Sequence, residues 1–516
     1  MRRSLASAAF LFAGACVSRP PVVPTEVAFA PRAERSILIC LDGIREDVFY
    51  EEVEAGHLPT FGFLLAHGSR FDRAVTIFPS ITFAAQAAAV TGSLPNRNGI
   101  PGIRWFDRVR VANRSYAGVG AVMLDADLET DCRTIFEYAR NGERTVSIVL
   151  QPARGSPRTP PLSWEDHWRG WLLAREYESD SPPAISGIWF TSGDYPAHEH
   201  GGRSPEVRVR LKEMDRAMGR VVETLDRRGL LATTAFGLFS DHGHHDIATH
   251  HDLWENLRTI GFTPRRILLY NARMNLGGYF DCVAWIGGDG YANVWVPRAV
   301  TGAAEGRPDW GPRPSEANLR AYSIRGETVD LPRAVAALPG VRWVAYRASP
   351  TEVAVVSDSG EARISSDRAA GSKTSLSYAY RVARGEDPLD YGALADDRPR
   401  TAEAWLAATA DSTSPDGPVG LAALLDGPRA PDLFVAAEPH VEIAQSPHHS
   451  RHGGITREEM RVPVFVAGAG VERGRIPHGR TIDLVPTLLR AMGRGEDFDG
   501  DGTARGSSGA GGGGRN

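Results

Sequence analysis

Five separated clusters in the sequence carry side chains that bind metal ions. They are Asp42 and residues 78–82, 194–198, 240–244 and 447–454. Three carboxylates together with three histidines make a ligand set that suits two Zn²⁺ ions. Two such ions about 4 Å apart can clamp the attacking and leaving oxygens of a phosphoryl displacement. The residue types therefore predict a two-metal site for phosphoryl chemistry.

Thr82 stands at the start of an Ala-rich helical pattern that runs to Val90. Backbone N–H groups and the helix dipole favour negative charge at such a position, and a metal ion bound to the hydroxyl would activate it. Each cluster taken alone also fits a structural role, such as a helix cap, a surface pair or a solvated loop. The order of the clusters, each after a strand or at a helix start, favours one shared site.

Continuous apolar runs predict the strands that position these clusters, at residues 36–41, 145–150, 185–190, 234–240 and 462–467. Helical patterns lie between them, at residues 58–66, 83–90, 206–225 and 484–492. This alternation predicts an α/β fold, a mostly parallel sheet with helices on both faces. Ligands of such sheets bind at the carboxyl ends of the strands, so the polar clusters should meet at one rim.

The expected domain organisation follows from this alternation of strands and helices. Residues 35–259 form the first part of the catalytic core and residues 441–496 the last part. Residues 260–440 interrupt this alternation with Gly- and Trp-rich strands and Pro/Asp-rich loops, which predicts a smaller inserted α+β cap. Residues 497–516 are Gly-rich and are expected to be a disordered tail.

The N-terminus resembles an export signal. Arg2 and Arg3 precede a short apolar stretch and small residues, so residues 1–16 are expected to be a signal peptide and 17–34 a linker. Two fates of Cys16 stay open, cleavage beyond it or lipidation as a bacterial lipoprotein anchor. The expected location is therefore the periplasm or cell envelope.

The composition argues against two other classes of protein, nucleic-acid coat proteins and disulfide-stabilised proteins. The formal net charge of -5 and the pI of about 6.3 give no sign of a nucleic-acid coat protein. Only four cysteines occur, and without Cys16 their number is odd, so no disulfide framework is implied. Any substrate phosphate would meet positive charge from bound metal.

The motifs resemble the type I phosphodiesterase/nucleotide pyrophosphatase family of the alkaline phosphatase superfamily. The resemblance rests on Ile39 to Gly43, on Phe78 to Phe83 with Val90-Thr91-Gly92, on Asp194-x-x-x-His198, on Ser240 to Gly243, on His452-Gly453-Gly454 and on Ile482 to Leu489. It covers about residues 35–255 and 440–492 and implies an alkaline-phosphatase-like fold.

The resemblance also implies roles for individual residues. Thr82 would be the nucleophile, and two divalent metal ions, expected to be Zn²⁺, would be bound. One ion would be held by Asp42, Thr82, Asp241 and His242, and the other by Asp194, His198 and His452. The implied reaction is cleavage of a phosphodiester or pyrophosphate bond in a nucleotide or phospholipid-like small molecule, through a phospho-threonine intermediate.

The sequence departs from the family at one position that matters. The family has a phosphate-binding Asn where this chain has Ile103, so Asn96 and Asn98 are the expected replacements. Losing such a donor costs about 10²–10³ in rate if nothing compensates. His200, His244, His245, His250 and His251 match no ligand position and are expected to surround the ligands or lie at the surface.

Other functions stay open at this point. A phosphomonoesterase, a phosphonate hydrolase and a phospholipid head-group transferase share the same ligand set. A non-enzymatic cell-envelope binding protein on a decayed hydrolase scaffold is favoured only by Ile103. The sequence does not determine the oligomeric state.

Overall fold

The computed structural model describes residues 21–157, 165–266, 272–274, 278–300, 302, 306, 308–368 and 377–506. The expected signal peptide, including Cys16, lies outside the described residues, as do residues 507–516. Within the described ranges, no helix has both the length and the apolar character needed to cross a membrane.

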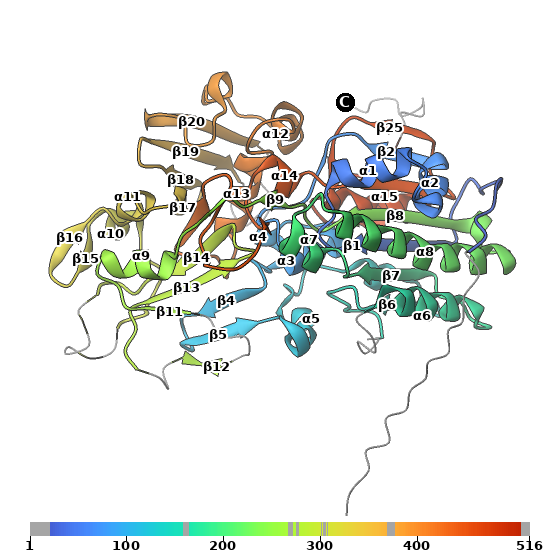
Figure 1. Ribbon diagram of the computed structural model, residues 1–516, viewed down its shortest axis with the longest axis horizontal. Coiled ribbons are helices and arrows are strands. Elements are labelled where there is room, and N and C mark those ends of the chain that lie inside the picture. The colour runs from blue at the N-terminus through green and yellow to red at the C-terminus, as the bar shows by residue number, and fades with distance from the viewer. Residues whose placement is uncertain are drawn as a thin grey trace, which may run out of the picture.

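A seven-stranded sheet forms the right-hand half of the molecule in Figure 1. Its strands, in spatial order, are β25 (Gly474–Ile476), β2 (Gly68–Phe71), β24 (Val464–Gly468), β8 (Thr234–Ser240), β1 (Arg35–Leu41), β7 (Ile185–Phe190) and β6 (Thr145–Ile148). β8, β1, β7 and β6 are parallel, and β24 is antiparallel to both of its neighbours. The expected mostly parallel sheet is confirmed.

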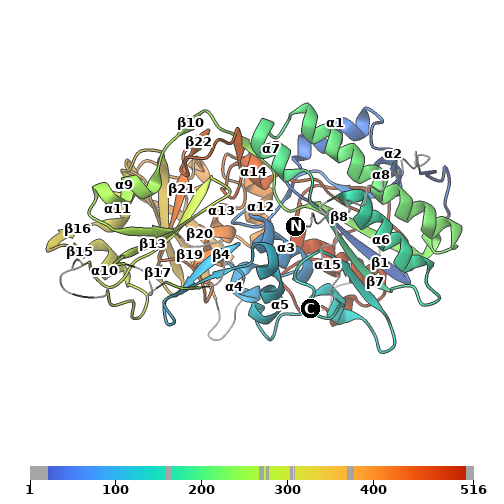
Figure 2. The same ribbon diagram turned by 60° about the horizontal axis from the view of Figure 1, so that its bottom comes forward.

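Strand β1 shows why its sequence is apolar without alternation. Ile37 and Ile39 pack on one face of the sheet, in a hydrophobic cluster with α1 (Glu46–Glu54), α2 (Pro59–Ala66), α6 (Asp166–Glu178) and α8 (Pro205–Arg227). Leu38 and Cys40 face the opposite cluster, which contains α15 (Leu484–Ala491). Helices therefore cover both faces, and α6 and α8 lie side by side on one of them in Figure 2.

The inserted region carries a second sheet, on the left in Figure 1. Its eight strands are β11 (Pro264–Arg266), β13 (Cys282–Gly287), β14 (Tyr291–Trp295), β21 (Leu433–Ala437), β17 (Val341–Ser349), β18 (Glu352–Val356), β19 (Gly360–Asp367) and β20 (Ser377–Gly385). All pairings are antiparallel except β11 with β13. The insertion is α+β as expected, but its sheet has one strand more than the core sheet.

Helices also cover both faces of the second sheet. One face packs against α9 (Leu253–Thr259), α10 (Glu316–Arg320) and α11 (Leu331–Ala336). The other packs against α12 (Ala402–Thr409) and α13 (Gly417–Leu425). The insertion therefore has a hydrophobic core of its own.

Helix α3 (Thr82–Thr91) joins the two halves, and Figure 1 shows it between the two sheets. Every residue of α3 is buried. Phe83 and Ala84 belong to the hydrophobic cluster of the second sheet, whereas Ala89 and Val90 belong to that of the first. The small alanine side chains let the helix pack closely on both sides, which fixes the position of Thr82 at its start.

Short elements complete the fold. The helices are α4 (Pro95–Asn98), α5 (Leu124–Asp127), α7 (Asp194–His200) and α14 (Arg457–Met460). The strands are β3 (Ala74–Val75), β4 (Arg104–Asp107), β5 (Ala112–Ser115), β9 (His245–Asp246), β10 (Thr249–His250), β12 (Ala272–Arg273), β15 (Tyr322–Ile324), β16 (Glu327–Val329), β22 (Val441–Glu442), β23 (Ser450–Arg451) and β26 (Gly479–Arg480).

The C-terminal segment differs from the expected disordered tail. Residues 497–506 lie against the core, and the backbone N–H of Asp501 donates to the carbonyl of Gly92 at 2.9 Å. Arg505 forms an ion pair with Asp483 at 2.8 Å and a second one with Glu403. The expectation was wrong for residues 497–506 because charged side chains within the Gly-rich segment find partners in the folded core.

Candidate metal and catalytic site

Thr82 lies at the first position of α3 with its hydroxyl beside His242. The distance from Thr82 Oγ1 to His242 Nε2 is 3.4 Å, and the residue is only 9% exposed. Ile81 occupies the N-cap position, and no side chain caps the helix. The Thr82 hydroxyl is therefore not used for capping, which removes the structural alternative raised by the sequence.

The first group of candidate ligands follows two adjacent parallel strands. Asp42 comes directly after β1, and Asp241 and His242 come directly after β8. Ligand atoms of these three residues lie within 4.8 Å of one another. Asp241 Oδ1 accepts hydrogen bonds from the backbone N–H groups of Gly43 and His242, both at 3.1 Å. These bonds fix the carboxylate at the end of the strand.

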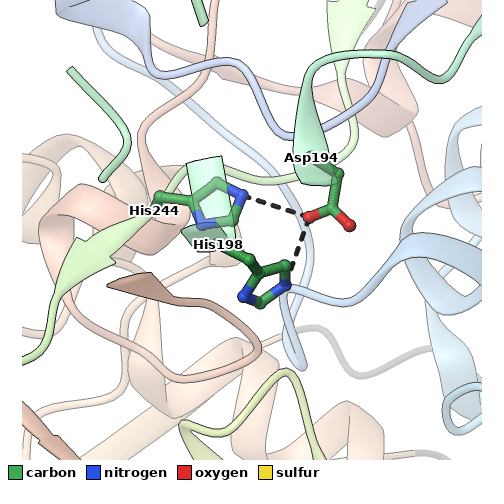
Figure 3. A group of neighbouring side chains, drawn as sticks. All are labelled: Asp194, His198 and His244. Atoms are coloured by element: carbon green, nitrogen blue, oxygen red, sulfur yellow. Dashed lines mark hydrogen bonds and ion pairs between the residues drawn. The ribbon is translucent and has the colours of Figure 1, made fainter. Parts of the chain in front are cut away.

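The second group is centred on Asp194, the first residue of α7. His198 lies one helical turn later, and its Nε2 is 3.4 Å from Asp194 Oδ1. His452 follows β23, and its Nε2 is 3.6 Å from the same oxygen. A third imidazole, that of His244, lies 3.1 Å from this oxygen, and Figure 3 shows it with His198 beside Asp194. The Asp194–His198 pair therefore faces inward and is no surface pair.

The two groups are neighbours. The rings of His242 and His452 stack with centroids 3.7 Å apart and an interplanar angle of 3°. His242 Nε2 lies 3.5 Å from Asp42 Oδ1 and 4.0 Å from Asp194 Oδ1. The structure thus brings together all seven residues expected at the two metals, namely Asp42, Thr82, Asp194, His198, Asp241, His242 and His452.

The electrostatics of the site reflect its buried carboxylates. Burial raises the pKa of Asp42 well above its usual range, and the charge of Asp241 raises it further. Burial likewise raises the pKa of Asp241. Burial lowers the pKa of His242, but the carboxylates of Asp241, Asp42 and Asp194 together outweigh it and raise the pKa to about 9. The first group therefore favours additional positive charge.

The donor set fits divalent metal ions. Asp42 Oδ1 is buried and has no hydrogen-bond partner among the described residues. His198 Nδ1 donates to the carbonyl of Ser450 at 2.9 Å, His242 Nδ1 to that of Gly243 at 3.2 Å and His452 Nδ1 to that of Ser80 at 3.2 Å. A carbonyl only accepts, so each neutral ring presents the lone pair of Nε2 to the carboxylates. This is the arrangement by which proteins orient histidine ligands.

Comparison with known families agrees with this geometry. The family model for type I phosphodiesterase / nucleotide pyrophosphatase matches residues 36–263, a segment that contains the candidate ligands from Asp42 to His242. Residues 36–263 are therefore similar to this family. The suspected resemblance is therefore confirmed.

Two curated relatives carry the same description. Human ectonucleotide pyrophosphatase/phosphodiesterase family member 5 is 21% identical over 230 residues, which cover 42% of this chain and 46% of the relative. An uncharacterized pyrophosphatase/phosphodiesterase of Schizosaccharomyces pombe is 23% identical over 221 residues, 40% of this chain and 44% of the relative. The matched segment spans less than half of each relative.

Solved structures show the same fold over almost the whole chain. Murine ectonucleotide pyrophosphatase/phosphodiesterase 5 aligns with a TM-score of 0.55 at 15% identity, covering 92% of this chain and 97% of that one. An inactive threonine-to-alanine variant of the murine protein in complex with AMP aligns with the same TM-score and coverage at 14% identity. The expected alkaline-phosphatase-like fold is confirmed.

The family's phosphate-binding Asn has no evident replacement here. Ile103 packs against the hydrophobic cluster of the second sheet. Asn98 is fully buried, and its amide donates to the carbonyl of Ser93 at 2.8 Å and accepts from the backbone N–H of Ile100 at 2.8 Å. Asn98 therefore stabilises its own turn, and Asn96 in the same short helix stays the remaining prediction for substrate binding.

The structure adds three residues to the candidate site. His244 is fully buried against Asp194, so it surrounds the candidate ligands and does not lie at the surface. Asp289, in the turn between β13 and β14, accepts a hydrogen bond from His448 Nδ1 at 2.5 Å, and the His448 ring lies 4.6 Å from that of His198. The repeated histidines of residues 240–245 and 447–452 signalled His244 and His448, whereas nothing in the sequence around Asp289 did.

Proposed function

We propose that the chain is a metal-dependent hydrolase of phosphodiester or pyrophosphate bonds, with Thr82 as its nucleophile. The observation that carries this proposal is the position of the Thr82 hydroxyl. It stands at the start of α3, 3.4 Å from His242 Nε2, beside two adjoining groups of carboxylates and imidazoles. The similarity of residues 36–263 to the type I phosphodiesterase/nucleotide pyrophosphatase family supports the same reaction.

Two divalent ions, which we take to be Zn²⁺, fit the two groups. Bound there, they would lower the pKa of the Thr82 hydroxyl and neutralise charge on the phosphoryl oxygens. One group is Asp42, Asp241 and His242 with Thr82 beside them. In the other group, His198 and His452 both face Asp194. The mixed carboxylate and imidazole donors, without any thiolate, favour Zn²⁺ over the all-oxygen sites of Mg²⁺ or Ca²⁺.

The protein's own residues then perform displacement and hydrolysis. Thr82 Oγ1 attacks phosphorus, and the oxygen of the leaving group departs on the opposite side with the electron pair of the broken P–O bond. The resulting phospho-threonine is hydrolysed by water, which returns the hydroxyl. The first backbone N–H groups of α3 (Thr82–Thr91) have no partners within the helix, so they would be available to hydrogen-bond the phosphoryl oxygens.

The substrate class we propose is a small nucleotide-like or phospholipid-like phosphoester. Support comes from the murine relative, whose inactive threonine-to-alanine variant was solved with AMP. The hydrophobic Ile103 at the position of the family's Asn keeps a phosphomonoesterase, a phosphonate hydrolase or a head-group transferase as the second candidate.

The test compares bis-p-nitrophenyl phosphate with p-nitrophenyl phosphate, using chain purified without chelator and analysed for zinc. We expect the diester to be turned over faster, loss of activity on chelation, and recovery when zinc is added back. Faster turnover of the monoester would favour the second candidate. Stoichiometric metal without turnover of either compound would contradict the proposal and favour a binding protein on a hydrolase scaffold.

A further inference from the structure

His244 is a fully buried histidine whose two ring nitrogens both have partners. Its Nδ1 lies 2.9 Å from Ser450 Oγ, and Ser450 Oγ lies 2.6 Å from the carbonyl oxygen of Ala197. The carbonyl can only accept, so the Ser450 hydroxyl hydrogen is directed to Ala197. Ser450 Oγ therefore accepts from His244 Nδ1–H. The neutral His244 ring must then direct the lone pair of Nε2 at Asp194 Oδ1, 3.1 Å away.

The same reasoning applies to His198 and His452, whose Nδ1–H groups donate to backbone carbonyls. Three imidazoles therefore direct Nε2 at one carboxylate oxygen. Three protonated rings would place a net charge of about +2 in a buried site, which its desolvation cost disfavours. At least one Nε2 lone pair then faces Asp194 Oδ1 with no hydrogen between them, an arrangement that a shared cation stabilises.

The three distances to Asp194 Oδ1 match the edges of a tetrahedral site. With metal–ligand distances of about 2.0–2.1 Å, the edges between ligand atoms are about 3.3 Å. The three Nε2 atoms lie 3.1, 3.4 and 3.6 Å from Asp194 Oδ1. Ring centroids about 3.2 Å from the metal would be about 5.2 Å apart. The observed centroid distances are 5.0 Å for His198–His244, 5.0 Å for His198–His452 and 5.2 Å for His244–His452.

We propose that His244 Nε2 is a fourth protein ligand of the cation held by Asp194, His198 and His452. His242 differs, because it stacks on His452 and its Nε2 is closer to Asp42 Oδ1 than to Asp194 Oδ1. This inference rests on the proposed metal-dependent function and deepens it.

The experiment replaces the native metal in the full chain by Co²⁺, whose visible absorption reports its coordination. The variants are His244→Ala and His244→Gln, the second of which keeps most of the side-chain volume. His245→Ala is the matched control, because His245 is the adjacent buried histidine but its Nδ1 faces Glu458 at 3.3 Å. Circular dichroism confirms that each variant is folded before cobalt affinity and spectra are measured.

In the wild-type chain and His245→Ala we expect the intense bands of four-coordinate Co²⁺. Both His244 variants should lose those bands and bind one of the two cobalt ions more than about 100-fold more weakly, beyond the 10–100-fold effect of a residue that only orients a ligand. Unchanged spectra and affinity in both His244 variants would overturn the inference alone. A wild-type chain that binds no cobalt would overturn the inference and the proposed function together.

Discussion

Replacing Thr82 and Thr91 by alanine, one at a time, separates catalysis from stability. The two residues are of the same type, both are buried, and they lie at opposite ends of α3. Thr82 faces the candidate ligands, whereas the Thr91 hydroxyl donates to the carbonyl of Ala87 at 2.6 Å. Thr91→Ala is therefore the matched control for Thr82→Ala.

The structure predicts that Thr82→Ala mainly lowers activity, whereas Thr91→Ala mainly affects stability. Thr82→Ala removes no helix cap and only a 3.4 Å contact with His242, so the free energy of unfolding should change by less than about 1 kcal/mol. It removes the nucleophile, so kcat/KM should fall at least about 10³-fold, or about 4 kcal/mol in transition-state free energy. Thr91→Ala loses a buried hydrogen bond worth about 1 kcal/mol, partly offset by the better helix propensity of alanine, and should keep its activity.

The assay measures kcat/KM on bis-p-nitrophenyl phosphate, zinc content and urea unfolding for wild type, Thr82→Ala, Thr82→Ser and Thr91→Ala. Thr82→Ser should keep part of the activity because a hydroxyl remains. A fully active Thr82→Ala protein with normal zinc content would refute the assignment of the nucleophile. An equal loss of activity in Thr91→Ala would show that the effect comes from the helix and not from the hydroxyl.

Three further predictions follow from other contacts. The Ser80 hydroxyl donates to the carbonyl of Gly454 at 2.7 Å beside His452, so Ser80→Ala should release zinc to a chelator about 10-fold faster, and unchanged release would contradict this. Burial raises the pKa of Asp215 to about 6 from 3.8, so its folded state binds the proton more tightly. Stability relative to Asp215→Asn should therefore fall by up to about 3 kcal/mol as pH rises from about 4 to 7, and parallel urea-unfolding profiles would refute it. We also propose export, with an anchor at Cys16 as the alternative to cleavage beyond it, and mass spectrometry that finds an intact Met1 would exclude export.

The core sheet was predictable because its strands are buried on both faces. The apolar runs at 185–190 and 234–240 coincide with β7 (Ile185–Phe190) and β8 (Thr234–Ser240). The run at 145–150 ends as a strand at Ile148, because Val149 has a φ of 54°. The run at 462–467 became the antiparallel strand β24, since hydrophobicity carries no information about strand direction.

The second sheet could not be predicted strand by strand. β19 is buried at its start and exposed toward its end, so its sequence lacks a continuous apolar run. The eight strands pair across a region interrupted by Pro- and Asp-rich loops. Such pairing depends on contacts between residues far apart in the sequence.

The candidate metal ligands could be picked out from the sequence because each follows a strand or starts a helix in a recognisable motif. His244 was not, because its role depends on the direction of the Ser450 hydroxyl, which comes from another segment. Asp289 was missed for a similar reason. It reaches His448 only through the turn between β13 and β14, 159 residues away along the chain.

The central claim is that the two groups of side chains bind two metal ions beside Thr82. Anomalous diffraction at the zinc edge, from crystals of protein purified without chelator, tests it most directly. We predict two peaks about 4 Å apart. One should be surrounded by Asp42, Asp241 and His242, and the other by Asp194 and its histidines. A single peak, or no peak at these residues, would contradict the account.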